Sequence, residues 1–313
     1  MKVSKNVKEN RHLYIGGSDI AAVMGVSRWK TPLTLWAEKT GKIDTPDLSN
    51  VEAVEMGTRL EQFVADMFAV RANKSVRRAP KVYQHKDYPY MVAHIDRLVT
   101  GTDELLECKT CSLFKKEEWE NEDIPKEYIL QVMWYLGITG RKTGYIAVLI
   151  GGQSFKYKKI EFDQEMFDIM VNAAKDFWEH VQNDTPVAAS ADDSETLKEL
   201  YSECNEVLIE MFPEDEKTAE ATIAFEEKVA HLQELKREAK ELDAEKKQIE
   251  AEIKEIIKGN LGIKTPKYLI TWKYQNGQII YDKELMMSDG VFEKYSSQSV
   301  NRVMRIAANK EVA

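Results

Sequence analysis

Apolar residues in the first 182 positions follow two different periods. Spacings of three and four predict helices, and they occur over Ser18–Gly25, Pro32–Thr40, residues 51–73, residues 126–137 and the stretch Met166–Trp178. Ser18 is a suitable N-cap for the first helix, because its hydroxyl can accept a backbone hydrogen bond. Pro32 suits the first turn of the second helix, and Gly41 suits its end. The pattern therefore predicts several amphipathic helices in this part of the chain.

Short runs rich in Val, Ile, Leu and Tyr predict strands between these helices. The runs are Lys81–His85, Tyr90–Val99, Glu104–Cys108, Gly144–Ile150 and Phe155–Phe162. The last two are separated by Gly151-Gly152, which suits a hairpin turn. Strands interleaved with helices over residues 1–182 indicate an α/β domain with a mixed sheet flanked by helices.

A change of composition marks the end of this domain. Residues 183–194 (NDTPVAASADDS) are small and polar and include a proline, which is typical of a linker. The sequence therefore predicts two domains, residues 1–184 and residues 185–313. In the second domain, apolar residues from Leu197 to Met211 indicate one helix. A heptad pattern from about Thr218 to Lys258 indicates a longer one.

The heptad pattern of the long helix contains two charged interruptions, Lys228 and Lys246. Its apolar a and d positions are Phe225, Leu232, Leu235, Ala239, Leu242, Ile249, Ile253 and Ile256. Because lysines weaken an intermolecular seam, an intramolecular antiparallel helical hairpin is favoured over a coiled-coil dimer. The segment YLITWKY–NG–QIIYD, turned at Asn276-Gly277, predicts a small β-hairpin after the helices.

Composition excludes several classes of protein. The 313 residues include 43% hydrophobic and 31% charged residues, enough apolar content for a substantial core. No apolar run approaches the ~20 residues of a membrane span. No apolar stretch follows the basic N-terminus, so no secretory signal is expected. Three cysteines are too few to staple a chain of this length, which indicates a reducing cytoplasm.

The net charge of −9 is unevenly distributed along the chain. Residues 1–110 carry 17 Lys and Arg against 14 Asp and Glu, a net charge of +3. Residues 191–313 carry 18 against 26, a net charge of −8. The overall acidity therefore does not exclude a nucleic-acid substrate for the N-terminal domain.

The strongest chemical signal lies in two consecutive predicted strands. Asp96 ends the apolar run MVAHID, and Glu107 and Lys109 lie in the next run, LLECK. Alternation along a strand puts Glu107 and Lys109 on one side and Cys108 on the other. Two carboxylates suit Mg²⁺, which keeps several waters and can take a phosphate oxygen. The lysine can orient or deprotonate an attacking water and screen the charge that develops on phosphorus.

The same residue types also form cross-strand ion pairs on exposed sheet faces. Further residues are therefore needed to distinguish a functional site from a surface ion pair. Glu61 lies in the apolar helix 51–73 and could supply a third carboxylate. Gln131 and Tyr135 are one helical turn apart on an otherwise apolar helix, where their polar atoms need partners. The glycines before Ser18 offer backbone amides to an anion. These features favour a functional site over a surface ion pair, although His94 is more simply explained as a structural residue.

Five sequence blocks occur in the order found in a known family. They are GGSDIAAVMGVSRWKTPLTLWAEKTG, MGTRLE, AHIDRLV, LLECKT and YILQVMWYLGITG…GYIAVLIGG. Over roughly residues 11–182 the chain closely resembles the YqaJ-type viral recombinases, which are similar to phage lambda exonuclease. The resemblance implies the PD-(D/E)XK (restriction-endonuclease-like) fold. It also implies a Mg²⁺-dependent exonuclease that digests one strand of duplex DNA from the 5′ end and leaves 3′ tails for phage or prophage recombination.

The resemblance assigns roles to the carboxylate cluster by position. Asp96 and Glu107 match the metal carboxylates, and the Cys108 carbonyl matches a backbone metal ligand. Lys109 matches the catalytic lysine. Glu61 matches a helix glutamate that contacts a metal or its water. One departure is Ala-His-Ile-Asp in place of the motif's Pro-Asp, which leaves the carboxylate itself present.

Further residues are assigned to DNA. Gln131 matches a helix glutamine near the scissile phosphate, and Arg11 and Ser18, seven residues apart, match a pair that holds the 5′-terminal phosphate. Additional candidates for DNA contact are Arg28, Trp29, Lys30 and Tyr135.

The implied cofactor is Mg²⁺, with Mn²⁺ as a substitute and two ions per site. The implied partners are double-stranded DNA ends and a RecT-like single-strand annealing protein, with a ring-shaped trimer acting in the host cytoplasm. Two alternatives remain open. A structure- or sequence-specific endonuclease could use the same fold, and a non-catalytic DNA-binding scaffold could use the helical region. Arg11 and Ser18 favour the exonuclease, and the intact acid, acid and lysine set argues against the scaffold.

Overall fold

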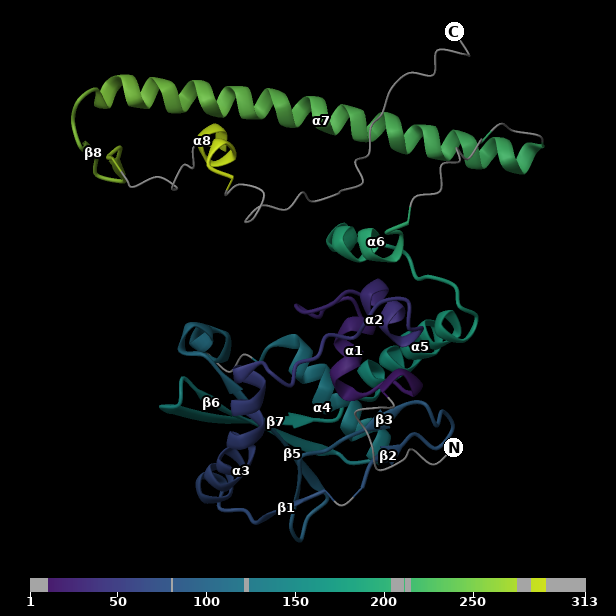
Figure 1. Cartoon of the computed structure of the whole chain (residues 1–313). Coiled ribbons are helices and arrows are strands. Elements are labelled where there is room, and N and C mark those ends of the chain that lie inside the picture. The colour runs from purple at the N-terminus through teal and green to yellow at the C-terminus, as the bar shows by residue number, and fades with distance from the viewer. Residues whose placement is uncertain are drawn as a thin grey trace. The chain divides into compact units, whose positions relative to one another are not determined.

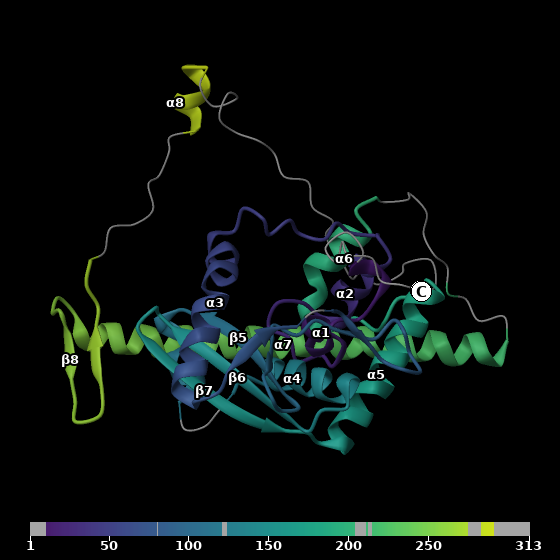
Figure 2. The same ribbon diagram turned by 90° about the horizontal axis from the view of Figure 1, so that it is seen from below.

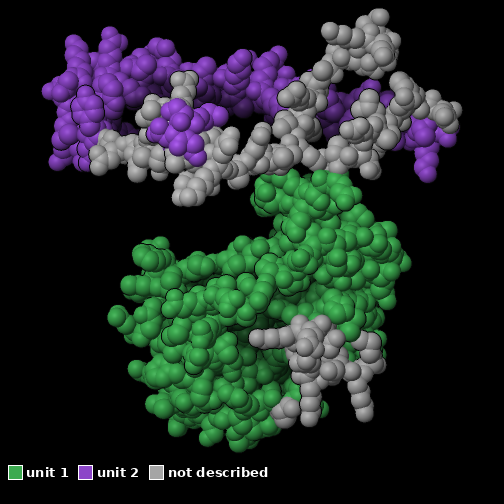
Figure 3. Space-filling view, viewed as in Figure 1, with its two compact units in different colours: residues 1–204 green, residues 205–313 purple. Residues whose placement is uncertain are grey.

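The structure is a computed structural model of the chain and describes residues 11–79, 81–120, 124–203, 211, 215–274 and 283–290. The chain forms two compact units, residues 1–204 and residues 205–313, which Figure 3 colours separately. All the candidate site residues from Arg11 to Tyr135 belong to the first unit.

A mixed sheet lies at the centre of the first unit. It contains, in spatial order, β1 (Val76–Arg78), β4 (Arg97–Val99), β5 (Glu104–Cys111), β6 (Thr143–Ile150) and β7 (Ser154–Glu161) (Figure 1). Strands β5 and β6 are parallel, and the other neighbouring pairs are antiparallel. The mixed sheet that the sequence predicts is confirmed, and β5, which carries Glu107 and Lys109, is its central strand.

Helices cover both faces of this sheet. The helices of this unit are α1 (Gly17–Val23), α2 (Pro32–Lys39), α3 (Glu52–Ala72), α4 (Lys126–Thr139), α5 (Gln164–Gln182) and α6 (Ser194–Leu200), with 3₁₀ segments at Arg11–Leu13, Leu113–Trp119 and Ala191–Asp193. On one face, Phe68 of α3 packs in a core with Leu106. On the other face, Leu105 and Val148 join a larger core with residues of α1, α4 and α5. Figure 2 shows α3 apart from α1, α4 and α5, which lie close together. Alternate residues of β5 thus face two separate cores, as the period of a strand requires.

Local signals begin and end these elements close to where the periodicity predicts. The Thr31 hydroxyl accepts from the Thr34 N–H at 3.0 Å and caps α2. Gly140, at φ 70°, ends α4 in the left-handed region that favours glycine. Gly151 and Gly152 also have positive φ and turn β6 into β7. The predicted helices and this hairpin are therefore confirmed.

Two local expectations are wrong. Ser18 is not the N-cap of α1, because Gly16 holds that position and its N–H donates to the Asp19 carboxylate at 3.1 Å. The predicted strand Tyr90–Val99 is divided into β4 and β3 (Val92–Ala93), which pairs with β2 (Tyr83–Gln84) in a separate small sheet. The chain leaves one sheet and enters the other between these strands, so Asp96 lies at a junction and not inside a strand.

The segment after α5 packs on α2. The Thr31 hydroxyl donates to the Asp193 carboxylate, and the Thr34 and Thr196 hydroxyls are 2.7 Å apart. Asp193 is fully buried and also accepts hydrogen bonds from the N–H and hydroxyl of Ser190. These bonds fasten α6 to the first unit, which extends to residue 204 and past the boundary that the sequence places at residue 184.

In the second unit a single long helix, α7 (Glu216–Ile257), spans 42 residues and confirms the predicted helix. Its apolar heptad positions are largely exposed, with Phe225 at 53%, Leu242 at 65% and Ile256 at 68%. The predicted hairpin partner of α7 is not found within the described residues. Its first part forms α6 of the first unit, and residues 204–210 lie outside the described residues.

A small β-hairpin follows α7. Strand β8 (Gly262–Lys264) pairs antiparallel with β9 (Leu269–Thr271). The predicted turn at Asn276-Gly277 lies outside the described residues. A Cβ at Gly262 would lie 2.0 Å from a backbone oxygen of β9, so the close approach of the strands requires glycine. The short helix α8 (Lys283–Ser288) comes last. Across the part of the chain described here, no helix is both long and apolar enough to cross a membrane.

Candidate active site

Asp96 and Glu107 come from different segments and are held beside each other. Glu107 lies in β5, and only 3% of it is exposed. Asp96 directly precedes β4, and its Oδ2 accepts from the backbone N–H of Cys108 at 2.9 Å. This bond ties Asp96 to the residue next to Glu107. The structure therefore brings together the two carboxylates that the sequence singles out.

Lys109 and Gln131 complete a polar cluster around Glu107. Lys109 Nζ donates to Glu107 Oε1 at 2.7 Å and to Gln131 Oε1 at 2.9 Å. Gln131 Nε2 donates to the same Glu107 oxygen and to the Tyr135 hydroxyl, each at 2.8 Å. The Lys109 ammonium also lies 4.9 Å from the ring centroid of Tyr128. Strand alternation on β5 and one-turn spacing on α4 direct these groups to a common centre.

The charges of this cluster are not balanced. Burial raises the pKa of Asp96 well above its ordinary value, and the neighbouring Glu107 carboxylate raises it further. Burial opposes the charge of Lys109, but the Glu107 carboxylate outweighs this effect and raises the pKa of the lysine. Two close carboxylates beside one ammonium thus favour an additional cation.

The second oxygen of Glu107 tests whether a metal ion fits. Glu107 Oε2 is buried and has no hydrogen-bond partner among the described residues. Such an atom is costly unless a cation or a donor completes its environment. No group of three or more His, Cys, Asp or Glu side chains that could hold a metal occurs in the described ranges. Two carboxylates whose shell is completed by water and phosphate oxygens match Mg²⁺, and they do not match a structural zinc site.

The Cys108 thiol lies on the opposite side of β5 from Glu107. Its side chain packs against the core under α3, and burial raises the pKa of the thiol and so disfavours the thiolate. A thiolate ligand is therefore not available to a metal at Glu107. Only the backbone carbonyl of Cys108 remains for the predicted metal contact.

Arg97, which sequence reasoning missed, holds Glu61. This arginine is 2% exposed, and its Nη1 donates to Glu61 Oε1 and to the Asp96 carbonyl. Its Nη2 donates to the Gln62 side chain at 3.1 Å. Glu61 thus belongs to the neighbourhood of Asp96, but arginine engages one of its oxygens. The arginine within the apolar run HIDRLV is the signal that could have revealed this buried partner.

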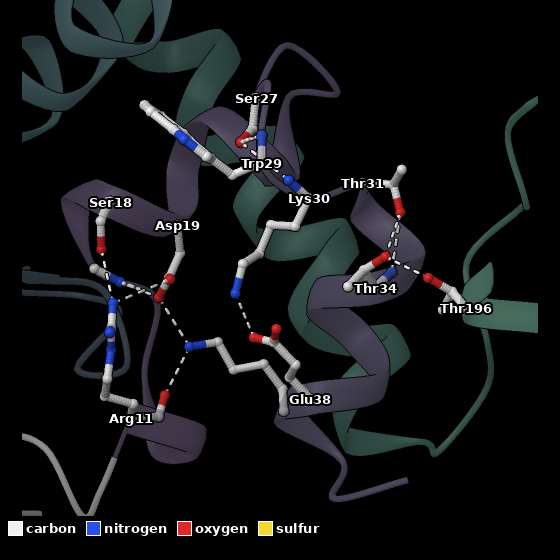
Figure 4. A network of polar contacts seen from close by, with 12 residues as sticks. Arg11, Ser18, Asp19, Ser27, Trp29, Lys30, Thr31, Thr34, Glu38 and Thr196 are labelled. Atoms are coloured by element: carbon white, nitrogen blue, oxygen red, sulfur yellow. Dashed lines mark hydrogen bonds and ion pairs between the residues drawn. The ribbon is translucent and has the colours of Figure 1, made fainter. Parts of the chain in front are cut away.

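Arg11 and Ser18 also come together, as Figure 4 shows. Arg11 Nη2 donates to Ser18 Oγ at 3.0 Å and lies 3.8 Å from Asp19 Oδ1. Arg11 and Ser18 are exposed, whereas Asp19 is buried. Lys39, a second residue that the sequence did not reveal, forms an ion pair with Asp19 at 2.8 Å.

Tyr135 connects the two clusters. Its hydroxyl accepts from Gln131, and its ring packs against α1, where a Cβ at Gly17 would lie 2.3 Å from a ring carbon. Only glycine permits this approach of α1 to α4. The helix that carries Ser18 therefore rests directly on the helix that carries Gln131, and Tyr135 lies between the two clusters.

Of the residues proposed for other DNA contacts, Trp29 is the most accessible. It is 60% exposed, and its ring centroid lies 6.2 Å from that of Tyr128, which also contacts Lys109. The two basic neighbours form ion pairs with carboxylates, Arg28 with Glu118 and Glu127, and Lys30 with Glu38. The positive charges of Arg28 and Lys30 are thus largely compensated within the protein.

Comparison with known proteins places this site in a family. Residues 7–142, which include every candidate site residue, match the YqaJ-like viral recombinase domain. The chain is 38% identical over 234 residues to "Uncharacterized protein YqaJ" of Bacillus subtilis (strain 168), and the match covers 72% of each chain. The chain belongs to the YqaJ-like viral recombinase family. The family that the five sequence blocks indicate is therefore confirmed.

One solved structure shows the same fold over more than half of the chain. An alkaline exonuclease (LHK-Exo) from Laribacter hongkongensis matches with a TM-score of 0.50 and 18% identity, over 58% of this chain and 94% of that chain. A phage-related exonuclease from Haemophilus somnus matches with a TM-score of 0.41 and 14% identity, over 55% of this chain and 96% of that one. At this identity the likeness to the alkaline exonuclease establishes the fold, and it confirms the predicted fold class.

Proposed function

We propose that this protein is a metal-dependent exonuclease that digests one strand of double-stranded DNA from its 5′ end. The observation that carries the proposal is the Glu107 carboxylate. This carboxylate is buried near Asp96, and one of its oxygens accepts a hydrogen bond from Lys109. Its other oxygen has no hydrogen-bond partner among the described residues. Paired carboxylates beside a lysine suit metal-assisted phosphodiester hydrolysis. Family membership and the exonuclease fold of the first unit support the same activity.

In this proposal Asp96, Glu107 and the Cys108 carbonyl hold Mg²⁺, with Mn²⁺ as a substitute and two ions per site. The bound metal would supply positive charge to the phosphate and lower the pKa of a coordinated water. Glu61, which Arg97 holds close to Asp96, is assigned to a metal or its water.

The residues around the metal ligands position the reacting groups. Lys109, as an ammonium, orients the attacking water and screens the charge that develops on the phosphoryl oxygens. Gln131 is assigned to the vicinity of the scissile phosphate. It bonds to both Lys109 and Glu107 and is itself held by Tyr135. Removal of Gln131 would therefore disturb the orientation of the lysine and of the carboxylate together.

Arg11 and Ser18 are the proposed binding pair for the 5′-terminal phosphate. A guanidinium forms strong charge-assisted hydrogen bonds with phosphate oxygens, and both residues of this pair are exposed. A pocket for a DNA end has no use in mid-duplex cleavage, so it favours the exonuclease over an endonuclease. Trp29 offers an aromatic surface on which a base can stack.

The test compares a linear duplex that carries 5′-phosphates with a closed circle of the same sequence, each with Mg²⁺ or EDTA. We expect loss of the linear DNA alone, only with Mg²⁺, and with a 5′-terminal label released before a 3′-terminal label. Nicking of the circle would replace the exonuclease by an endonuclease. If the protein binds DNA but does not cleave it in Mg²⁺ or Mn²⁺, it is a non-catalytic DNA-binding scaffold.

The proposed partners follow from the product. A bare 3′ strand needs a single-strand annealing protein, and we assign the contact with a RecT-like protein to the exposed apolar seam of α7. The net charge of −8 over residues 191–313 opposes binding to a DNA backbone, which makes this region better suited to protein. The proposed assembly is a ring-shaped trimer in the host cytoplasm. Sedimentation of the full chain measures the oligomeric state.

A further inference from the structure

A buried carboxylate lies beside Arg11 and Ser18, the proposed binding pair for the 5′-terminal phosphate. A negative charge at this place would repel the phosphate. Asp19 directly follows Ser18 and is 5% exposed, and its Oδ1 is 3.8 Å from the guanidinium of Arg11. A carboxylate so close to an arginine normally takes it as a hydrogen-bond partner, which would leave less of its charge for a ligand. The structure must therefore contain something that keeps Arg11 and Asp19 apart.

Lys39 is placed to do this. Its Nζ donates to Asp19 Oδ2 at 2.8 Å, and the Gly16 N–H donates to the same oxygen at 3.1 Å. At 3.8 Å the contact between Arg11 and Asp19 is too long for a hydrogen bond. Arg11 instead donates to Ser18 at 3.0 Å (Figure 4).

The same ammonium also fixes the backbone of Arg11. Lys39 Nζ donates to the Arg11 carbonyl oxygen at 2.6 Å, across 28 residues of sequence. One side chain thus neutralises Asp19 and holds the main chain from which the Arg11 side chain extends. It lies 5.5 Å from the ring centroid of Tyr14, which covers it on another side.

Lys39 is buried at a cost, because burial lowers the pKa of its ammonium although Asp19 opposes this effect. Only 4% of its side chain is exposed, and it shares the buried face of α2 with Leu35 and Trp36. An apolar residue would fill this position without the cost of removing an ammonium from water. Burial also opposes the charge of Asp19, but Lys39 and Arg11 outweigh it and lower the pKa of this carboxyl, so it stays ionised.

We propose that Lys39 is a positioning residue that neutralises Asp19 and so leaves Arg11 available for the 5′-terminal phosphate of DNA. The inference rests on the proposed function. With Lys39 the cluster of Arg11, Asp19 and Lys39 has a net charge of +1. Without Lys39 the net charge is zero, and Arg11 becomes the main partner of Asp19.

The test measures the preference for a 5′-phosphate over a 5′-hydroxyl as the ratio of two equilibrium dissociation constants. Fluorescence anisotropy of short duplexes in EDTA gives these constants without cleavage. We expect Lys39→Met to reduce the preference about tenfold, as the loss of a charge-assisted phosphate contact does. Lys42→Met is the matched control, because Lys42 is a more exposed lysine three residues away that pairs with Asp184. It should keep the preference.

A second variant separates positioning from packing. Lys39→Met combined with Asp19→Asn removes both charges, restores a net charge of +1 and should recover the preference to within about threefold of the wild type, because pairwise coupling makes the two changes non-additive. If Lys39→Met alone does not fold, this double variant still decides, since a folded double variant that lacks the preference overturns the proposal. If the double variant loses as much of the 5′-phosphate preference as the sum of the losses in the two single variants, Lys39 contributes only to packing.

The outcomes also distinguish this inference from the proposed function. A wild-type chain without any preference for phosphorylated ends would overturn the terminal-phosphate role of Arg11, and the role of Lys39 with it. A wild-type preference that survives Lys39→Met would overturn the role of Lys39 alone.

Discussion

The two units of the chain use charged side chains in opposite ways. In the first unit Asp19, Lys39, Arg97 and Glu107 are buried, and most of their partners are distant in sequence, as in the pairing of Arg97 with Glu61. On α7 the described ion pairs join residues three or four positions apart, and their side chains are exposed. A buried charge depends on tertiary structure for its partner, whereas an exposed helical pair needs only the helix.

Apolar residues show the same contrast. Leu105 of β5 is fully buried under α4, whereas Leu242 of α7 is 65% exposed although both belong to regular hydrophobic patterns. Periodicity therefore indicates which face of an element is apolar, but not whether that face is covered within the chain. The difference suggests that changes in the first unit act on folding or catalysis, and that changes along α7 act on association.

The largest expected effect is catalytic and confined to the first unit. Lys109→Ala should lower the rate of DNA hydrolysis by about 10²–10³, because a preorganised charge at the transition state is lost. Glu107→Gln should act similarly and also weaken metal binding. Initial rates on a linear duplex measure both.

Lys247→Ala is the control on α7 for these variants. Its side chain is 71% exposed and pairs only locally with Asp243 among the described residues, so the rate should not change. Equal rate losses in Lys109→Ala and Lys247→Ala would contradict the contrast between the units.

The next effect concerns where the first unit ends. A chain ending at residue 184 loses the bonds of Asp193 and Thr196 to α2, whereas a chain ending at residue 203 keeps them. We expect the free energy of unfolding of the shorter chain to be lower by about 2 kcal/mol, because each of the two lost hydrogen bonds contributes roughly 1 kcal/mol. Urea titration of both chains measures the difference. If the two chains are equally stable, the first unit ends at residue 184, as the sequence predicts.

Asp193 should make this junction sensitive to acid. Burial alone would raise the pKa of its carboxyl, but hydrogen bonds from Thr31 and Ser190 outweigh burial and lower it. A lowered folded-state pKa adds stability that is present above about pH 4, the ordinary aspartate range, and is lost as the pH falls through the folded value. Asp193→Asn should therefore destabilise the protein at pH 7 and much less near pH 3. A difference that is constant across this range would show that the charge does not contribute.

The smallest expected effect on stability lies on the seam of α7. Leu242→Ser should change the free energy of unfolding by no more than about 0.5 kcal/mol, as exposed substitutions usually do. Leu105→Ala in the first unit should lower the free energy of unfolding by about 2–5 kcal/mol.

Pull-down of the annealing protein by full-length Leu242→Ser should be reduced while nuclease activity stays unchanged. Undiminished capture would place the partner site elsewhere.

The amino-acid sequence by itself determined the features that depend on short-range geometry. Alternation along a strand is enough to put Glu107 and Lys109 on one side and Cys108 on the other, and the structure has this arrangement. One-turn spacing likewise places Gln131 beside Tyr135. The order of the five sequence blocks identified the family and its fold. These features need no knowledge of which distant segments meet.

Only the tertiary structure decided the partners of the buried charges. Nothing in local periodicity pairs Arg97 with Glu61 or Lys39 with Asp19, because these partners come from different elements that packing brings together. The N-cap of α1 is Gly16 and not the predicted Ser18. Asp19 accepts from the Gly16 N–H three residues earlier, and the same carboxylate also binds Lys39 of α2, so this cap residue has a local partner and a tertiary one. A residue's own neighbours set the direction of its side chain, but the rest of the fold sets what that side chain meets.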